Sequence, residues 1–136
     1  MRYLLDSNAW IVHFRQSTLE VTRRLALHPA NGILLCSIVI GELQFGVERC
    51  PISQRATNQV LLDDLRQQYQ SLPFDDAAAL EYAIVRADLT ARGLMIGGND
   101  MQIAAIARTN GLTLVTHNVA EFSRVPGLLV EDWQVP

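Results

Sequence analysis

The sequence predicts an α/β fold with a central parallel sheet. Short apolar runs alternate with stretches of helical periodicity along its 136 residues, and this alternation is typical of repeated strand–helix units. Hydrophobic residues make up 49% of the chain, so a packed core is expected rather than a disordered chain. There is no repeat, low-complexity segment or flexible linker, and we therefore expect a single domain over residues 1–136.

The first segments predict a strand and two helices. The apolar run at residues 2–6 is the first strand, and Ser7 is the expected N-cap of a helix that reaches about Phe14. The Ser-Thr-Leu-Glu sequence at residues 17–20 is a capping box. It predicts a second helix, which ends near Leu27.

The next segments predict a buried strand and two longer helices. The continuous apolar run at residues 33–36 is typical of a strand covered on both faces. Ser37 is the expected cap of a helix that ends near Arg49, shortly before a proline. Ser53 is the expected cap of a more polar helix, which reaches about Tyr69.

The middle of the chain predicts a brief strand at residues 72–74 and then a long helix. Asp75 and Asp76 precede this helix, and Gly93 ends it. Its apolar side chains recur at helical spacing, so they share one face. These side chains are Leu80, Ile84, Ala87 and Ala91.

The last segments predict a helix, two strands and a tail. Asn99 is the expected cap of a helix through about Thr109, and residues 112–116 form the clearest strand. A short turn or helix follows near Glu121. Residues 128–131 predict a final strand, after which the acidic residues of the C-terminal segment are expected to be exposed.

The charge balance excludes a protein that coats nucleic acid through bulk positive charge. The formal net charge is −3, from 14 acidic residues and 11 basic ones, all arginine. No apolar run approaches the ~20 residues of a membrane-spanning helix, and no secretory signal is expected. Cys36 and Cys50 fit no zinc-ligand spacing and are expected to be free thiols. These features predict a cytoplasmic protein without a membrane partner.

Two acids lie where a carboxylate is unexpected. Asp6 ends the first strand, and ligands of open α/β sheets bind beyond the carboxyl ends of strands; the alternative is that Asp6 only caps the next helix. Glu42 has apolar or small neighbours three and four residues away, so it needs a metal, a substrate or an arginine as partner. Gly41 and Gly46 cost helix stability, which predicts that something approaches this helix closely.

Two further acids complete the candidate set. Asp100 begins a helix whose body is apolar almost all round and therefore buried, although the helix dipole alone also favours an aspartate there. Glu121 follows the strand at residues 112–116, where an exposed glutamate is ordinary. Thr116 and Asn118 lie at the same strand edge and can hydrogen-bond a ligating carboxylate. His117 is the one histidine close enough to this site to contact a substrate.

Oxygen ligands without cysteine or histidine are the set that suits Mg²⁺ or Mn²⁺. Two such ions can activate a water and stabilise the leaving oxygen of a phosphodiester. The sequence has no glycine-rich phosphate fingerprint, nucleophile elbow or HExxH motif. The residues therefore favour metal-assisted phosphodiester chemistry without a protein nucleophile.

Four segments in a fixed order resemble one family. They are Tyr3-Leu-Leu-Asp-Ser-Asn8; Gly41-Glu-Leu43 with Gly46; Ile96-Gly-Gly-Asn-Asp100 with Ile103-Ala-Ala105; and Leu114-Val-Thr-His-Asn118 with Glu121-Phe122. Over nearly its full length the chain resembles the VapC toxins of the PIN-domain ribonucleases. It departs from the family at Met95, where a proline is frequent, and at Asn118, where many members have an aspartate.

The resemblance implies a PIN-like three-layer α/β/α fold with a central, mostly parallel sheet of four or five short strands. It implies a Mg²⁺-dependent endoribonuclease, with Mn²⁺ as the alternative metal, that cleaves RNA by metal-activated water. The substrate it implies is a tRNA such as initiator tRNA. The implied metal ligands and catalytic residues are Asp6, Glu42, Asp100 and Glu121. The implied supporting residues, which order these ligands, are Ser7, Thr116 and Asn118.

The resemblance also implies partners. These are a cognate VapB-like antitoxin, whose C-terminal segment covers the site, and a second copy of the chain in a homodimer. The toxin–antitoxin complex is expected to bind operator DNA through the antitoxin. Two alternatives stay open from the residues: a Mg²⁺-dependent phosphatase or phospho-receiver protein using Asp6, and a non-catalytic PIN-like binding module.

Overall fold

Five short strands form one sheet at the centre of the molecule. The structure is a computed structural model that describes residues 1–16 and 18–136. Each strand pairing is parallel, and the spatial order is β3-β2-β1-β4-β5. The strands are β1 (Tyr3–Leu5), β2 (Ile33–Cys36), β3 (Gln70–Leu72), β4 (Thr113–Val115) and β5 (Val130–Glu131). The predicted α/β fold with a parallel sheet is confirmed.

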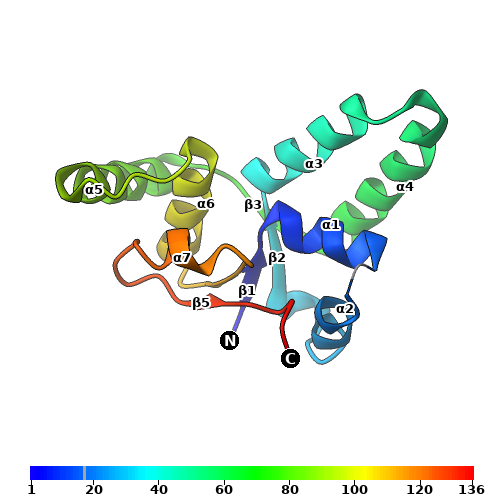
Figure 1. Cartoon of the computed structure of the whole chain (residues 1–136), viewed down its shortest axis with the longest axis horizontal. Coiled ribbons are helices and arrows are strands. Elements are labelled where there is room, and N and C mark those ends of the chain that lie inside the picture. The colour runs from blue at the N-terminus through cyan, green and yellow to red at the C-terminus, as the bar shows by residue number, and fades with distance from the viewer. Residues whose placement is uncertain (17) are drawn as a thin grey trace.

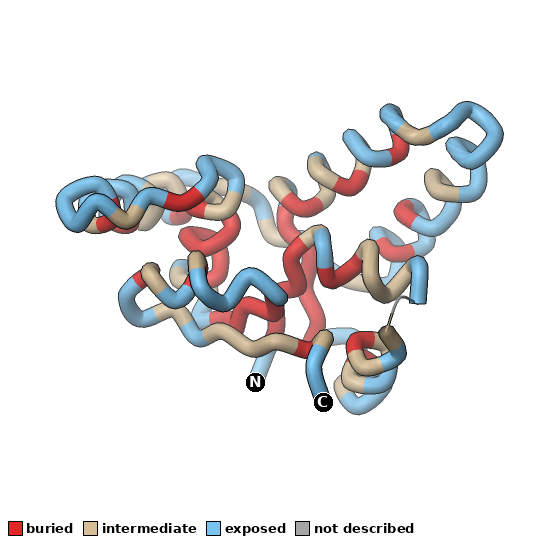
Figure 2. The backbone as a smooth tube through the Cα atoms, viewed as in Figure 1, coloured by how far each residue is buried: buried red, intermediate tan, exposed pale blue. Residues whose placement is uncertain are grey.

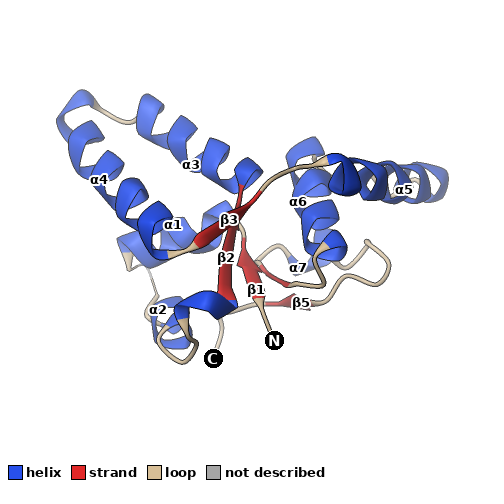
Figure 3. Cartoon of the chain, turned by 180° about the vertical axis from the view of Figure 1, so that it is seen from behind, coloured by secondary structure: helices blue, strands red, loops and turns tan. Residues whose placement is uncertain are grey.

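Helices flank the sheet on two sides. The helices are α1 (Ser7–Arg15), α2 (Glu20–Leu25), α3 (Ser37–Arg49), α4 (Ile52–Gln68), α5 (Asp76–Arg92), α6 (Gly98–Thr109) and α7 (Val119–Phe122), with a 3-10 turn η1 at Ala30–Gly32. The strands lie between α5 and α6 on one side and α1, α3 and α4 on the other (Figures 1 and 3). None of the helices among the described residues is long and apolar enough to cross a membrane.

Burial concentrates in the strands and in α6 (Figure 2). Leu4 and Leu5 of β1 are fully buried, and so is most of α6 between Met101 and Ala107. A parallel sheet covered on both faces has continuous apolar strands rather than alternating ones, which explains why the short apolar runs marked the strands in the sequence. The predicted central position of α6 is confirmed.

The first predicted cap is wrong. Asp6, not Ser7, is the N-cap of α1, and its Oδ1 accepts a hydrogen bond from the Ala9 N–H at 2.9 Å. A shorter β1 places Asp6 at the cap and makes Ser7 the first helical residue. The Ser7 hydroxyl is thereby free to act elsewhere.

The other serine and asparagine caps are also wrong. Ser37 is the first residue of α3, and its Oγ accepts from the Phe74 N–H at 3.0 Å. The residues before Ser53 and Asn99 begin α4 and α6, because Pro51 and Gly97 already take the extended backbone of a cap. The predicted cap at Ser17 lies outside the described residues. Side chains of this kind hydrogen-bond several local partners, so boundaries shift by a residue.

The long helix α5 is confirmed, but the face that its periodicity singled out is exposed. Leu80 is 72% exposed and Ile84 is 58% exposed. The buried face instead carries Ala78, Val85 and Leu89. Gly93 ends the helix in the left-handed region at φ +67°, as expected of a glycine at this position. Helical spacing predicts a helix, but small residues can make its packed face as well as large ones.

Candidate functional site

Asp6 lies where the ends of β1 and β4 meet α1. Its N–H donates to the Val115 carbonyl at 3.0 Å, and its side chain is 8% exposed. Burial raises the pKa of the Asp6 carboxyl, and the negative charges of Glu42 and Asp132 raise it further. Hydrogen bonds from Thr116 and from the Ala9 N–H oppose this shift. The carboxylate is thus held firmly in a place that disfavours its charge.

Glu42 reaches the same site from α3, the helix that follows β2. The Ser7 hydroxyl donates to Glu42 Oε1 at 3.1 Å, so α1 orients this carboxylate. The alternative partner for Glu42, an arginine, is absent among the described ion pairs. The helix stripe around Glu42 is only partly a core stripe, because Val39 is fully buried but Phe45 is 59% exposed. A Cβ at Gly41 or Gly46 would meet nothing within 4 Å, so nothing in the described chain approaches α3 there.

Asp100 enters from the first turn of α6 on the other side of the sheet. Desolvation raises the pKa of its carboxyl to about 6, with further contributions from Glu42, Glu121 and Asp6 in that order. Four acids from four parts of the chain therefore act electrostatically on one another. A cation bound among them would relieve both the burial cost and the repulsion.

The structure brings three of the four candidate acids into one open pocket of about 360 Å³. Its lining residues are Asp6, Ser7, Asn8, Glu42, Asp100, His117, Asn118 and Phe122. Glu121 does not line the pocket. It lies one turn further on, in α7, where Asn118 Nδ2 donates to its Oε2 at 2.9 Å. Thr116 is buried behind the pocket, and its Oγ1 accepts from the Asn118 N–H at 3.0 Å.

The pocket has the donor chemistry of a hard divalent cation. Asp6, Glu42 and Asp100 supply carboxylate oxygens, and no described ion pair includes any of them. Within the described part of the chain, no three acidic, histidine or cysteine side chains are already close enough to hold a metal ion. The residues fit Mg²⁺ or Mn²⁺ by type and by charge.

The sequence prediction missed Asp132. It was expected in an exposed tail, but its side chain is 17% exposed, and Oδ2 lies 2.9 Å from Nδ1 of His117. Asn8 and Phe122 also line the pocket without having been assigned a role. The signal for Asp132 was its neighbour Trp133: a large apolar residue in a supposed tail predicts that the tail packs against the domain.

The Asp100 shift predicts a pH dependence of stability in metal-free protein. A carboxyl whose pKa rises from 3.8 unfolded to about 6 folded stabilises the fold fully below pH 3.8 and loses that contribution as pH rises through about 6. The Asp100→Asn variant does not titrate. As pH rises from 3.8 through about 6, wild type should therefore lose unfolding free energy relative to Asp100→Asn. The difference should be on the order of 1 kcal/mol after solvent screening.

Urea unfolding in EDTA between pH 4 and 7.5 measures this difference. Asp64→Asn, which changes an exposed acid on α4, is the matched control and should show a flat difference. An equally flat profile for Asp100→Asn would contradict the electrostatic description of the pocket.

Comparison with known proteins gives consistent matches. A family model described as PIN domain matches residues 3–128. "Ribonuclease VapC2" of Rickettsia felis is 34% identical, and "tRNA(fMet)-specific endonuclease VapC" of Salmonella typhimurium is 30% identical, each over 98% of both chains. A crystal structure of VapBC2 from Rickettsia felis bound to a promoter DNA fragment superposes with a TM-score of 0.89 and 34% identity, covering 98% of this chain and 99% of that one.

Proposed function

The chain belongs to the PIN domain family and, within it, to the VapC ribonucleases, and from that premise we propose that it is the toxin of a type II toxin–antitoxin pair and a metal-dependent endoribonuclease of the cytoplasm. The observation that carries this proposal is the pocket at the strand ends, where Asp6, Glu42 and Asp100 converge. The likeness to relatives named ribonuclease supplies the reaction class.

PIN-domain nucleases depend on divalent metal, and we propose Mg²⁺, with Mn²⁺ as the alternative. The metal supplies Lewis acidity toward the scissile phosphate and activation of the attacking water. Asp6, Glu42 and Asp100 are the residues proposed to hold it. Glu121 would add negative charge from just outside the pocket.

The supporting side chains keep these acids in place. Ser7 holds Glu42 through its hydroxyl, and Thr116 stabilises the ionised form of Asp6. Asn118 donates to Glu121 and also lines the pocket. Each contact restricts the orientation of one acid.

We propose a tRNA as the substrate, and initiator tRNA in particular. The Salmonella typhimurium relative is named a tRNA(fMet)-specific endonuclease. The pocket is open to solvent and lies at the carboxyl ends of the central strands, so a strand of folded RNA can reach it. With a net charge of −3, the chain depends on local contacts rather than on bulk attraction to RNA.

We propose that a VapB-like antitoxin covers this site through a neighbouring groove. The groove, of about 510 Å³, lies between α1, α3 and α4, and Glu42 belongs to both hollows. Its apolar residues include Phe14, Phe45 and Leu61, and Gly46 leaves its wall open. An amphipathic segment fits such a groove, and an arginine at its end would meet the acids. DNA binding would belong to the antitoxin.

A homodimer remains our expectation. The exposed Leu80 and Ile84 belong to α5, which lies across the sheet from the helices α1, α3 and α4 of the groove (Figure 1), and they offer an apolar face for a second copy.

Cleavage of tRNA by the purified, antitoxin-free protein tests the proposed function. We expect cleavage of an initiator tRNA transcript with Mg²⁺, its loss in EDTA and its return when Mg²⁺ or Mn²⁺ is added back. Sequencing of the cut ends, expected as 5′-phosphate and 3′-hydroxyl, locates the scissile bond. Cleavage that persists in EDTA would overturn the proposed metal dependence, and absence of cleavage of total RNA would favour a binding module.

A further inference from the structure

His117 has no role among the metal-site residues, yet it lines the pocket. It follows β4 directly after Thr116, and its side chain is 58% exposed. One ring nitrogen, Nδ1, lies 2.9 Å from Oδ2 of Asp132. The other, Nε2, has no hydrogen-bond partner among the described residues. The imidazole is therefore oriented on one edge and free on the other.

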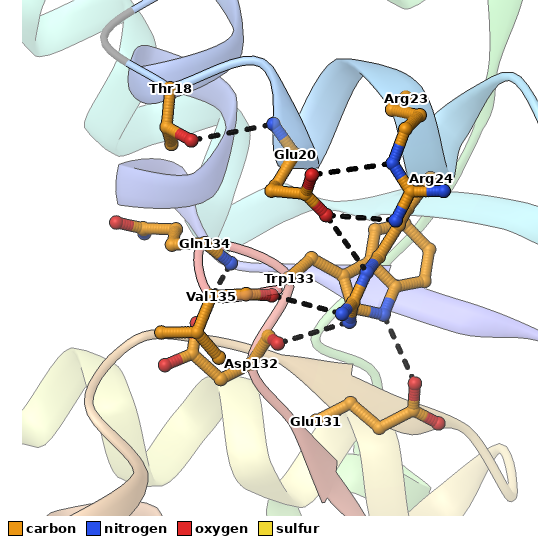
Figure 4. Close-up of polar contacts among 9 residues, drawn as sticks. All are labelled: Thr18, Glu20, Arg23, Arg24, Glu131, Asp132, Trp133, Gln134 and Val135. Carbon is orange, nitrogen blue, oxygen red and sulfur yellow. Dashed lines mark hydrogen bonds and ion pairs between the residues drawn. The ribbon is translucent and has the colours of Figure 1, made fainter.

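Asp132 is itself held in place. Its Oδ1 accepts from the Gln134 N–H at 2.9 Å, which leaves Oδ2 for His117. Its main-chain carbonyl accepts from Arg24 Nη1 at 3.1 Å, and the Val135 carbonyl accepts from Nη2 of the same guanidinium at 2.9 Å. Figure 4 shows Arg24 reaching from α2 to these carbonyls. One arginine thus fastens the segment that carries Asp132.

Trp133 packs the same segment against the core of the domain. It is 1% exposed, and its ring centroid lies 5.0 Å from that of Tyr3 and 5.3 Å from that of His28. Its indole N–H donates to Glu131 Oε1 at 3.0 Å (Figure 4). A carboxylate on so fixed a segment can hold a histidine in one orientation at little entropic cost.

The charges of the pocket indicate how His117 can contribute to substrate binding. Of the described residues that line the pocket, His117 is the one whose side chain can carry a positive charge. Three carboxylates face the same space, and an RNA strand brings further negative charge. The Asp132 carboxylate can only accept, so Nδ1–H donates to it and Nε2 is left for a substrate oxygen.

We propose that His117 is a substrate-binding residue whose Nε2 forms a hydrogen bond with an oxygen of the RNA backbone beside the scissile bond. Asp132, with the segment that Arg24 and Trp133 fasten, is a positioning residue for this contact. This inference rests on the proposed ribonuclease function and extends it to how the RNA strand is held. A phosphate oxygen and a ribose 2′-hydroxyl are the two oxygens that can occupy the position.

RNA binding measured without cleavage tests the contact. In the Asp6→Asn background, anisotropy of a fluorescent initiator tRNA transcript gives Kd at fixed salt. We expect His117→Ala to raise Kd about 10-fold, as for the loss of one well-oriented hydrogen bond to the strand, and Asp132→Asn to raise it less. Asp132→Asn should have no further effect once His117 is alanine, because Asp132 acts through the ring. His13→Gln, on α1 outside the pocket, is the matched control.

The same variants in the active protein separate binding from chemistry. His117→Ala should raise KM about 10-fold and leave kcat within about twofold. Oligonucleotides with one methylphosphonate or one 2′-deoxyribose beside the mapped cut identify the oxygen: the modification that no longer weakens binding in His117→Ala marks it.

An unchanged Kd for His117→Ala, or penalties for both modified oligonucleotides that persist in it, would overturn the inference. The proposed function would stand in that event, because it depends on cleavage by wild type and its loss in Asp6→Asn. Thermal unfolding of each variant shows whether a loss of binding is only a loss of fold.

Discussion

The Asp6→Asn variant is expected to cleave RNA about 10³-fold more slowly than wild type, which is the scale of losing a central electrostatic group in an active site. Asp6 is 8% exposed and lies at the end of β1. Asparagine keeps the Oδ1 acceptor that caps α1 through the Ala9 N–H but removes the negative charge. The loss should therefore fall on chemistry rather than on folding.

The measurement is the initial rate of tRNA cleavage with saturating Mg²⁺, alongside the free energy of unfolding. Asp64→Asn makes the same chemical change on the exposed side of α4 and should cleave at the wild-type rate. Cleavage by Asp6→Asn within a few-fold of wild type would remove Asp6 from the metal site. If Asp6→Asn does not fold, Asp100→Asn provides the same test, because the Asp100 side chain is less buried. We expect the Asp100→Asn variant to be equally inactive.

The Trp133→Ala variant is expected to lose about 3–5 kcal/mol of unfolding free energy. Trp133 is 1% exposed and packs between Tyr3 of β1 and His28. Removing it leaves a cavity under the sheet and frees the segment that β5 leads into. For a domain of this size such a change is a large part of the total stability.

Chemical denaturation followed by far-UV circular dichroism gives the value. Leu129→Ala, four residues earlier and 62% exposed in wild type, should change the free energy of unfolding by less than about 0.5 kcal/mol. A loss below about 1 kcal/mol for Trp133→Ala would mean that the C-terminal segment packs loosely. Asp132 would then not be held firmly enough to position His117.

The central strands β1, β2 and β4 were predictable because each is buried along its length, as the apolar runs at residues 33–36 and 112–116 indicated. The strand expected at residues 72–74 lies instead at Gln70–Leu72, where the first two residues are exposed and polar. Helix caps were not predictable, because Ser7, Ser37 and Asn99 can each hydrogen-bond several nearby groups, and a strand one residue shorter changes the cap. For α5 the spacing of apolar residues correctly predicted a helix, but it did not predict which face of that helix is packed. Alanine and valine pack closely against α6 there, so the larger Leu80 and Ile84 remain outside.

The three acids of the pocket were predictable for unequal reasons. Asp6 follows from the rule that parallel strands gather ligands at their carboxyl ends. Glu42 was noticed as a charge among apolar residues, although only Val39 of the stripe around it proves fully buried and Phe45 is exposed. Asp132 was missed because its segment is held by Arg24, more than a hundred residues earlier. The apolar neighbour Trp133 indicated that the segment packs, but not against which residues.

The strand order has a consequence for the rate at which this protein folds. The first strand, β1, is central, and its register with β4 pairs Tyr3 with Thr113, which closes a loop of about 110 residues. Such long-range closure is entropically slow, so we expect folding on the slow side for a chain of this length. Asp6 at the end of β1 meets His117 and Asn118 beyond β4 only when that closure occurs. A partly folded chain therefore has no assembled pocket.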